Sequence, residues 1–154
     1  MKRHLIGFML ATSLLLSGHC SVVARAFADE EISPKIAVTP VLKGLDHPWT
    51  LVFGPDGQLY FTERSGRFSR WDLHSAKAVS FSGVPKPRVQ GEAGLLGMAL
   101  DPDFAKNGFV YLCYSTSDAN GAGNRVSRFH LDGEKLSGEK ALLDRMPGAR
   151  YHNG

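Results

Sequence analysis

The sequence predicts an all-β protein built from repeated four-stranded sheets, the architecture of a β-propeller. Short runs rich in aromatic, β-branched and other apolar residues recur from Thr50 onward, and turns containing Gly, Pro and Asp separate them. The order of strands and turns then starts again in the second half of the chain. No helix of ordinary length is indicated beyond the N-terminal segment.

Four strands are expected in the first unit. Thr50–Phe53 is mostly apolar, which is typical of a strand buried on both faces. Pro55–Gly57 follows as a turn, because Pro presets φ and Gly accepts a positive φ. The aromatic and β-rich run Leu59–Glu63 is the return strand. Arg67–Leu73 and Ala78–Phe81 complete the unit.

The second unit is predicted to begin at Leu96–Leu100 and to return along Phe109–Tyr114. Its third strand, Arg125–Leu131, shares the pattern R-x-S-R-(aromatic)-x-L with Arg67–Leu73, and the two patterns lie 58 residues apart.

Two prolines, Pro85 and Pro147, mark the fourth strands of the two units. The spacing between the units widens along the chain, and we attribute this to longer turns in the second unit at Phe104–Gly108 and Ser115–Gly123.

Four antiparallel strands that recur about every 40–50 residues are typical of a propeller blade. The alternative is a β-sandwich with accidental self-similarity, which the ordered match of all four strand positions disfavours. Residues 49–154 would provide about two blades and the entry to a third. Two blades cannot close a ring, so we expect this chain to be the front part of a longer protein.

A secretory signal peptide is expected over residues 1–28. Lys2 and Arg3 precede the apolar run Leu5–Leu16, and an A-x-A sequence ends at Ala28. The apolar run is too short for a permanent membrane span. We therefore expect cleavage near Ala28, a periplasmic or secreted location, and no membrane anchor. Residues 29–48 read as a lead-in segment that could supply an edge strand.

Loss of the signal peptide removes three of the 18 basic residues and none of the 15 acidic ones, so the mature net charge is near zero. This balance argues against nucleic acid or an anionic membrane as a partner. Cys20 also leaves, so Cys113 has no intrachain disulfide partner. We interpret Cys113 as a small buried hydrophobic residue rather than a reactive thiol.

The segment Gln90–Gly97 places three glycines and Glu92 directly before the inner strand of the second unit. Glycines there allow the backbone to turn tightly or to approach a ligand closely. The Glu92 carboxylate can accept a hydrogen bond from a hydroxyl or take up a cation. An ordinary solvated loop acid is the alternative.

His152 lies in the final segment Arg150–Gly154, which by the repeat enters a third blade at the same kind of loop. We expect His152 to face the channel near Glu92, where a neutral imidazole can act as a general base. A surface histidine without a task is the alternative. Metal binding by His152 is disfavoured, because no second His or Cys lies at ligand spacing.

A family resemblance rests on three segments: PWTLVFGPDGQLYFTERSGRF, then GEAGLLGMALDPDF with the following N-G-F-V-Y, and finally Y-H-N-G. Together they resemble the soluble quinoprotein glucose/sorbosone dehydrogenases, from about Gly44 to the end of the chain. The most specific parts are G-(E/Q)-x-G-L-L-G and the His that opens an H-x-G-G-R-L-type run.

This resemblance implies a six-bladed propeller that holds pyrroloquinoline quinone (PQQ) and calcium and oxidises the C1 hydroxyl of an aldose to a lactone. It implies that His152 takes the hydroxyl proton while hydride passes to the quinone, that Glu92 lies beside the cofactor, and that an external acceptor takes the electrons. The residues expected to hold calcium and the quinone carboxylates come from later blades, so we expect this chain alone to be inactive.

Some positions depart from the family pattern. One close relative type has Gln at the position of Glu92 and Asp at that of Tyr151, which bears on sugar preference more than on the reaction. Two other functions remain as alternatives: a calcium-dependent lactone hydrolase and a propeller that only binds carbohydrate or protein. G-E-x-G-L-L-G together with His152 favours the dehydrogenase.

Overall fold

A computed structural model describes residues 36–119, 121–151 and 153. The signal peptide expected over residues 1–28 lies outside the described residues. The chain divides into two compact units at Pro40. Residues 36–40, the described part of the first unit, are exposed and form no helix or strand. Residues 41–47 of the second unit also form no strand, so the edge strand considered for the lead-in segment is not found in its described part.

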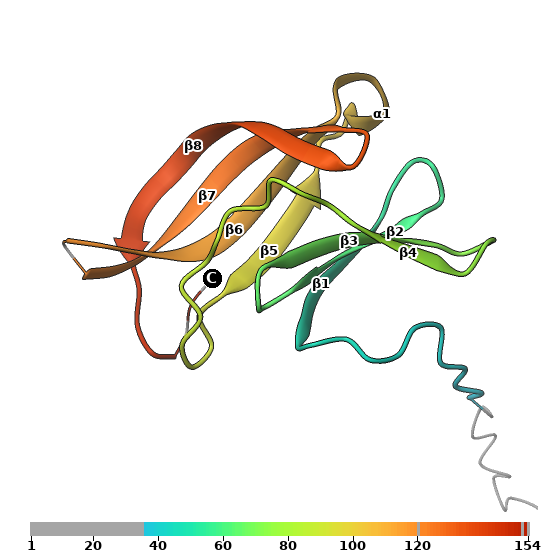
Figure 1. Ribbon diagram of the computed structural model, residues 1–154, viewed down its shortest axis with the longest axis horizontal. Coiled ribbons are helices and arrows are strands. Elements are labelled where there is room, and N and C mark those ends of the chain that lie inside the picture. Colours follow the sequence, from blue (N-terminus) through green and yellow to red (C-terminus); the bar gives the residue numbers. More distant parts are fainter. Residues whose placement is uncertain (1–35, 120, 152, 154) are drawn as a thin grey trace, which may run out of the picture. The chain divides into compact units, whose positions relative to one another are not determined.

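The first sheet is a four-stranded antiparallel meander in the order β1-β2-β3-β4 (Figure 1). Its strands are β1 (Pro48–Phe53), β2 (Leu59–Glu63), β3 (Arg67–Asp72) and β4 (Lys77–Ser80). Each of the four strands expected in the first unit is thereby confirmed.

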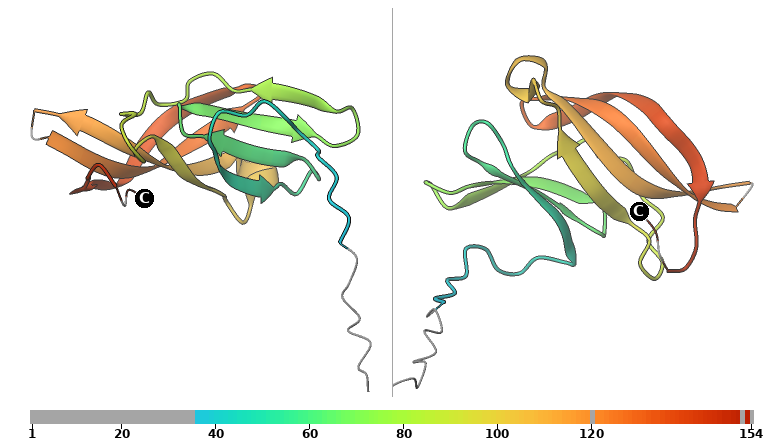
Figure 2. Two further views of the ribbon diagram at one scale, coloured as in Figure 1. Left: turned by 90° about the horizontal axis from the view of Figure 1, so that it is seen from below. Right: turned by 180° about the vertical axis from the view of Figure 1, so that it is seen from behind.

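The second sheet repeats this meander in the order β5-β6-β7-β8. Its strands are β5 (Leu95–Leu100), β6 (Phe109–Asp118), β7 (Gly121–Asp132) and β8 (Lys135–Pro147), with a four-residue helix α1 (Phe104–Asn107) between β5 and β6. β5 lies beside β1 and β2 of the first sheet, as the views in Figures 1 and 2 agree. Two meanders in sequence, rather than two interleaved layers, disfavour the sandwich alternative.

One of the two long turns expected in the second unit is wrong. Ser115–Asp118 continues β6, and its residues pair with the start of β7 from Ser115↔Asn124 to Asp118↔Gly121. The small polar residues of this region favour turns locally, but the antiparallel backbone ladder overrides that preference. The fourth strands also differ. Pro147 lies within the 13-residue β8, whereas Pro85 lies beyond the four-residue β4.

Two expectations about burial are also wrong. β1 is not buried on both faces: Leu51 is 58% exposed and Phe53 is 69% exposed. Side chains alternate along a strand, and these two point away from the face that packs on the second sheet. Cys113 is half-buried rather than buried. It lies on the face of β6 opposite the core residues Leu112 and Tyr114, and partial burial raises the pKa of its thiol.

An aromatic cluster joins the two sheets. The rings of Phe68 and Phe81 lie 4.7 Å apart between centroids, and both belong to the core shared with Leu112 of β6. Tyr60 contacts the edge of Phe104 in α1, with the centroids 5.6 Å apart. Full burial of side chains of this size stabilises the fold by about 1.5–3 kcal/mol each. The core therefore lies between the sheets, not within either one.

Backbone and hydroxyl contacts fix the seam between the sheets near the start of β5. The Thr62 hydroxyl donates to the Leu96 carbonyl at 2.7 Å, and the Leu95 amide donates to the Arg64 carbonyl at 3.0 Å. Gly94 lies so close to this carbonyl that a Cβ atom would come nearer than 3.0 Å to it. The glycine before β5 thus lets the two backbones meet.

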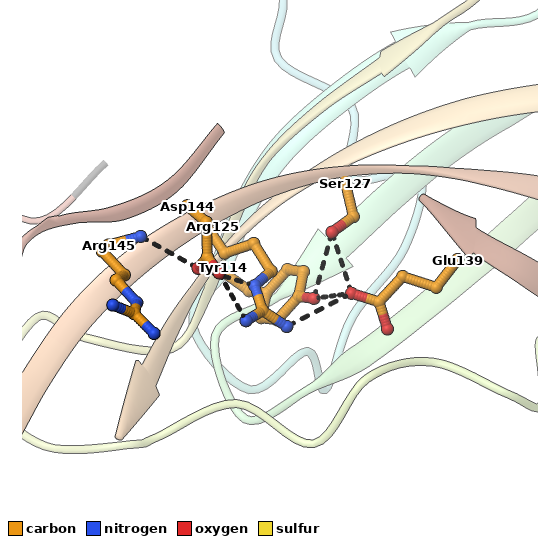
Figure 3. A network of polar contacts seen from close by, with 6 residues as sticks. All are labelled: Tyr114, Arg125, Ser127, Glu139, Asp144 and Arg145. Atoms are coloured by element: carbon orange, nitrogen blue, oxygen red, sulfur yellow. Dashed lines mark hydrogen bonds and ion pairs between the residues drawn. The ribbon is translucent and has the colours of Figure 1, made fainter. Parts of the chain in front are cut away.

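The repeated R-x-S-R pattern has a structural role in both sheets. In the first sheet, Arg67 forms an ion pair with the buried carboxylate of Glu63 at 2.6 Å, and Ser69 and Ser80 share a hydrogen bond between β3 and β4. In the second sheet the equivalent residues, Arg125 and Ser127, bind acids of β8 (Figure 3).

The Arg125 contacts are bidentate. Its guanidinium donates from two nitrogens to the two carboxylate oxygens of Asp144, each at 2.9 Å, and this lowers the pKa of Asp144. Glu139 accepts from the Ser127 hydroxyl at 2.8 Å and also from the buried Tyr114 hydroxyl (Figure 3). A bidentate arginine–carboxylate pair such as Arg125–Asp144 fixes the geometry of the two side chains as well as adding stability.

A tyrosine–aspartate hydrogen bond also recurs in the two sheets. The Tyr60 hydroxyl donates to Asp56 at 2.9 Å, and the Tyr111 hydroxyl donates to Asp101 at 2.6 Å. The two aspartates are not at equivalent positions, because Asp101 matches Gly54 of the first unit. Burial, followed by the bond to Asp56, raises the pKa of Tyr60 to about 12.

The close approach at Gly94 gives a prediction about stability. Gly94→Ala is expected to lower the free energy of unfolding by about 1–3 kcal/mol, because the new methyl group meets backbone that cannot give way. Gly97→Ala is the matched control, since its Cβ would make only a 3.4 Å contact with Cys113. Urea denaturation of both variants measures the difference. Equal losses would contradict the proposed seam.

The Asp101 contacts give a prediction about pH. Hydrogen bonds from Tyr111, Asn107 and the Asp103 amide lower the pKa of Asp101 in the folded protein. The stability that the ionised carboxylate contributes is therefore present above the unfolded pKa, near 3.9, and is lost as pH falls through the lower folded value. Asp101→Asn should flatten the loss of thermal stability on acidification.

The control for this pH experiment is Asp103→Asn, whose carboxylate bonds the exposed Lys106 ammonium at 3.0 Å. Surface pairs of this kind contribute little. The melting temperature is measured from pH 7 to pH 3. Its decrease with falling pH should become shallower in Asp101→Asn and stay nearly the same in Asp103→Asn. An unaltered slope in Asp101→Asn would show that this carboxylate does not contribute.

Candidate functional site

The loop before β5 is a tight turn, as its glycines predict. Gly91 has φ +60°, and the Ala93 amide donates to the Gln90 carbonyl at 3.0 Å. Ala93 and Gly94 are buried, whereas Glu92 at the tip of the turn is exposed. The turn therefore buries its backbone at Ala93 and Gly94 and leaves Glu92 exposed at its tip.

This turn contacts the final segment of the chain. The Glu92 amide donates to the Arg150 carbonyl at 3.1 Å, and a Cβ at Gly91 would come closer than 3.0 Å to the same carbonyl. The structure thus brings the backbone of Glu92 to the segment that carries the predicted base. His152 lies outside the described residues, so its position relative to Glu92 stays a prediction.

Asn153 closes a short loop in the final segment. Its side-chain oxygen accepts from the Ala149 amide at 3.0 Å, and its side-chain nitrogen donates to the Ala149 carbonyl at 2.7 Å. The Asn153 side chain is buried, with 4% of the residue exposed. An amide side chain therefore ties Asn153 back to Ala149.

Two buried residues that the sequence analysis did not single out lie between the turn and this loop. Ser115 of β6 exchanges backbone hydrogen bonds with the neighbourhood of the turn: its amide donates to Gly94 and its carbonyl accepts from Arg88, both at 2.8 Å. The Ser115 hydroxyl donates to Asn124 of β7 at 2.9 Å, and Asn124 reaches Asn153 at 3.4 Å. Polar residues next to strand-like sequence could have indicated these two buried side chains. The sequence analysis instead assigned Ser115–Gly123 to a turn.

Two arginine residues, Arg64 and Arg88, lie next to the turn. Arg88 donates to the side-chain oxygen of Gln90, and the carbonyl of Arg64 accepts from Leu95. Two further N–H groups, Arg64 Nε and one terminal nitrogen of Arg88, are buried and make no hydrogen bond within the described part of the chain. The guanidinium groups of Arg64 and Arg88 therefore lie near the turn that carries Glu92.

A candidate metal centre is not formed by the residues that the structure describes. Among them no three His, Cys, Asp or Glu side chains gather in a group that could hold an ion. The same residues contain no helix long and apolar enough to cross a bilayer.

A shallow hollow of about 500 Å³ lies elsewhere, at the opposite end of β5, where α1 follows. It is lined by Pro55, Asp56, residues 104–108 and residues 130–132. It is remote from the turn at Glu92, since β5 runs the length of the sheet between them.

Comparison with known proteins defines the class. Residues 45–154 match the family model described as glucose / sorbosone dehydrogenase. The chain belongs to this family, as the resemblance of its motifs predicted. The two meanders are therefore two consecutive blades of a β-propeller, which confirms the fold class expected from the repeat.

The chain is similar to two curated proteins with named activities. It is 36% identical over 107 residues to the aldose sugar dehydrogenase YliI of Escherichia coli K12, covering 67% of this chain and 29% of that protein. It is 33% identical over 124 residues to quinoprotein glucose dehydrogenase B of Acinetobacter calcoaceticus, covering 73% of this chain and 25% of that protein. The chain thus spans less than a third of each relative.

The chain is also similar to solved structures of aldose sugar dehydrogenases. The PQQ-bound aldose sugar dehydrogenase of Streptomyces coelicolor superimposes with a TM-score of 0.68 at 31% identity, covering 76% of this chain and 36% of that one. The apo-form of the soluble aldose sugar dehydrogenase of Escherichia coli gives a TM-score of 0.61 at 34% identity, covering 67% and 31%.

Proposed function

We propose that this chain forms part of a PQQ-dependent aldose dehydrogenase that oxidises the C1 hydroxyl of a sugar to a lactone. Membership of the glucose/sorbosone dehydrogenase family supports the proposal. The structural observation that carries it is the hydrogen bond from the Glu92 amide to the Arg150 carbonyl, because it joins the two segments with the most specific motifs. Family membership favours this function over the lactone hydrolase and the purely binding propeller.

The residues present fit one edge of a cofactor site. Glu92 lies exposed at the tip of its turn; Arg88 precedes this turn, and Arg64 of the β2–β3 turn contacts it at Gly94. When bound, PQQ would supply the acceptor for the hydride. From the family pattern, we propose that calcium and the quinone carboxylates are held mainly by other blades. Residues 29–154 expressed alone are then expected to be inactive.

His152 is the proposed general base. A neutral imidazole accepts the proton of the C1 hydroxyl, a role that requires a pKa near the working pH. Glu92 accepts a hydrogen bond from a neighbouring hydroxyl and so orients the sugar. An external acceptor would reoxidise the cofactor, and export after cleavage near Ala28 would place the enzyme in the periplasm or outside the cell.

Replacement of the base tests the mechanism. In the full-length protein reconstituted with PQQ and calcium, His152→Ala is expected to lower kcat by at least about 100-fold, because general base catalysis is lost. Sugar-dependent reduction of a dye measures kcat across common aldoses. His130→Ala, at the far hollow, is the control and should retain full activity. Undiminished turnover in His152→Ala would remove the imidazole from the mechanism.

Replacement of Glu92 tests the orienting role. Glu92→Gln keeps an oxygen acceptor, whereas Glu92→Ala removes it, so the second variant should lose about tenfold more of kcat/KM for the best sugar. The same dye assay serves, with Glu134→Ala on the β7–β8 turn as the control. If Gln and Ala behave alike, the Glu92 side chain does not bind the sugar as an acceptor.

A further inference from the structure

We propose that Asn124 is a positioning residue of the active site. It ties the Glu92 turn and the His152 segment to the same point of the second blade, and so fixes the distance between the proposed sugar contact and the proposed base. This inference rests on the proposed function for its catalytic meaning. Its structural content rests on the described contacts alone.

Asn124 uses both halves of its side-chain amide. Its oxygen accepts from the Ser115 hydroxyl at 2.9 Å, and its nitrogen donates to the Pro147 carbonyl at 3.2 Å and to the side-chain oxygen of Asn153 at 3.4 Å. Only 4% of the residue is exposed. A buried amide that satisfies three groups from three different segments holds those segments together, because each loses a partner if the amide is removed.

The connection to the Glu92 turn runs through Ser115. The Gly94 amide donates to the Ser115 hydroxyl at 3.3 Å, and the Ser115 amide donates to the Gly94 carbonyl at 2.8 Å. The Ser115 hydroxyl in turn donates a hydrogen bond to the Asn124 side-chain oxygen, so the donors run in one direction from the turn to Asn124. Gly94 is two residues from Glu92, and its backbone is fixed by the seam with Arg64.

The connection to the His152 segment runs through Asn153. Asn124 donates to the oxygen that also accepts from the Ala149 amide, and Asn153 in turn donates to the Ala149 carbonyl. These bonds join the two ends of the segment from Ala149 to Asn153. β7 is a long paired strand, so Asn124 offers both segments an anchor that does not move with either of them.

The alternative is that the network only stabilises the blade. Kinetic measurements can distinguish a positioning role from a purely stabilising one. Displacement of a catalytic group by about 1 Å can lower the rate up to about 100-fold while binding of the substrate is retained. Ser127 supplies a matched control. It is a buried residue of the same strand, three positions along, and its hydroxyl bonds Glu139 of β8 instead of either loop.

The experiment compares Asn124→Ala, Ser115→Ala and Ser127→Ala in the full-length protein. Amide hydrogen exchange, followed by mass spectrometry without PQQ, reports peptides covering residues 88–94 and 147–154. We expect Asn124→Ala to speed exchange in both segments by at least about tenfold while β2 and β3 stay protected. Ser115→Ala should act mainly on residues 88–94, and it serves where Asn124→Ala does not fold. Ser127→Ala should leave both segments unchanged.

The kinetic arm uses the protein loaded with PQQ and calcium. Asn124→Ala should lower kcat by about 10- to 100-fold and change KM for the sugar by less than about threefold. Unchanged exchange in both segments for Asn124→Ala and Ser115→Ala, or an equal effect of Ser127→Ala, would overturn the structural inference.

The two proposals fail in different ways. A wild-type protein that oxidises no aldose would refute the proposed function, while the exchange data would still decide whether Asn124 links the two segments. Altered exchange with an unchanged kcat in an active enzyme would show that the link exists and does not position the base, and this outcome overturns the catalytic part of the inference.

Discussion

The close approach of two backbones at Gly94 is the constraint on which the arrangement of the two blades depends. Leu95 and Thr62 bind carbonyls across this seam, and a side chain at position 94 would separate them. Because the aromatic core lies between the sheets, its packing requires this separation to be kept. The Gly94 carbonyl also accepts a hydrogen bond from the Ser115 amide, so this glycine links the seam to β6 two residues from Glu92.

Much of the fold could be predicted from the sequence because short stretches of neighbouring residues indicate the strands and turns of the repeat. Apolar runs, turn residues and the R-x-S-R pattern located the four strands of the first sheet and β5, β6 and β7 of the second, whereas Pro147 alone marked β8. The pattern places an arginine in an ion pair in both sheets, Arg67 with Glu63 of β2 and Arg125 with Asp144 of β8. The length of the β6–β7 hairpin escaped prediction. Its Ser, Thr and Asp residues have turn propensity, and the pairing that overrides it is a non-local property.

The candidate site was predicted only in part, for a related reason. Glycines and an acid before an inner strand identify a turn with Glu92 at its tip, because that information lies within eight residues. Asn124 and Ser115 matter through what they touch, and their partners lie up to 29 residues away. The residues next to Asn124 and Ser115 in the sequence give no sign of such pairing. The exposure of Leu51 and Phe53 could not be predicted for the same reason, since burial of the second face of β1 depends on what packs against it.

The edge of the second blade is the long strand β8, which carries Leu142 and Leu143 with about half of each residue exposed. A long exposed edge with apolar side chains can template pairing with strands of other molecules. Its register with β7 shifts at three places, and Arg145 adopts φ +55° near its end. Such irregularities bend the strand and interrupt the row of free amides and carbonyls. We therefore expect the bulges next to the Arg125–Asp144 contact to disfavour pairing of this edge with an incoming strand.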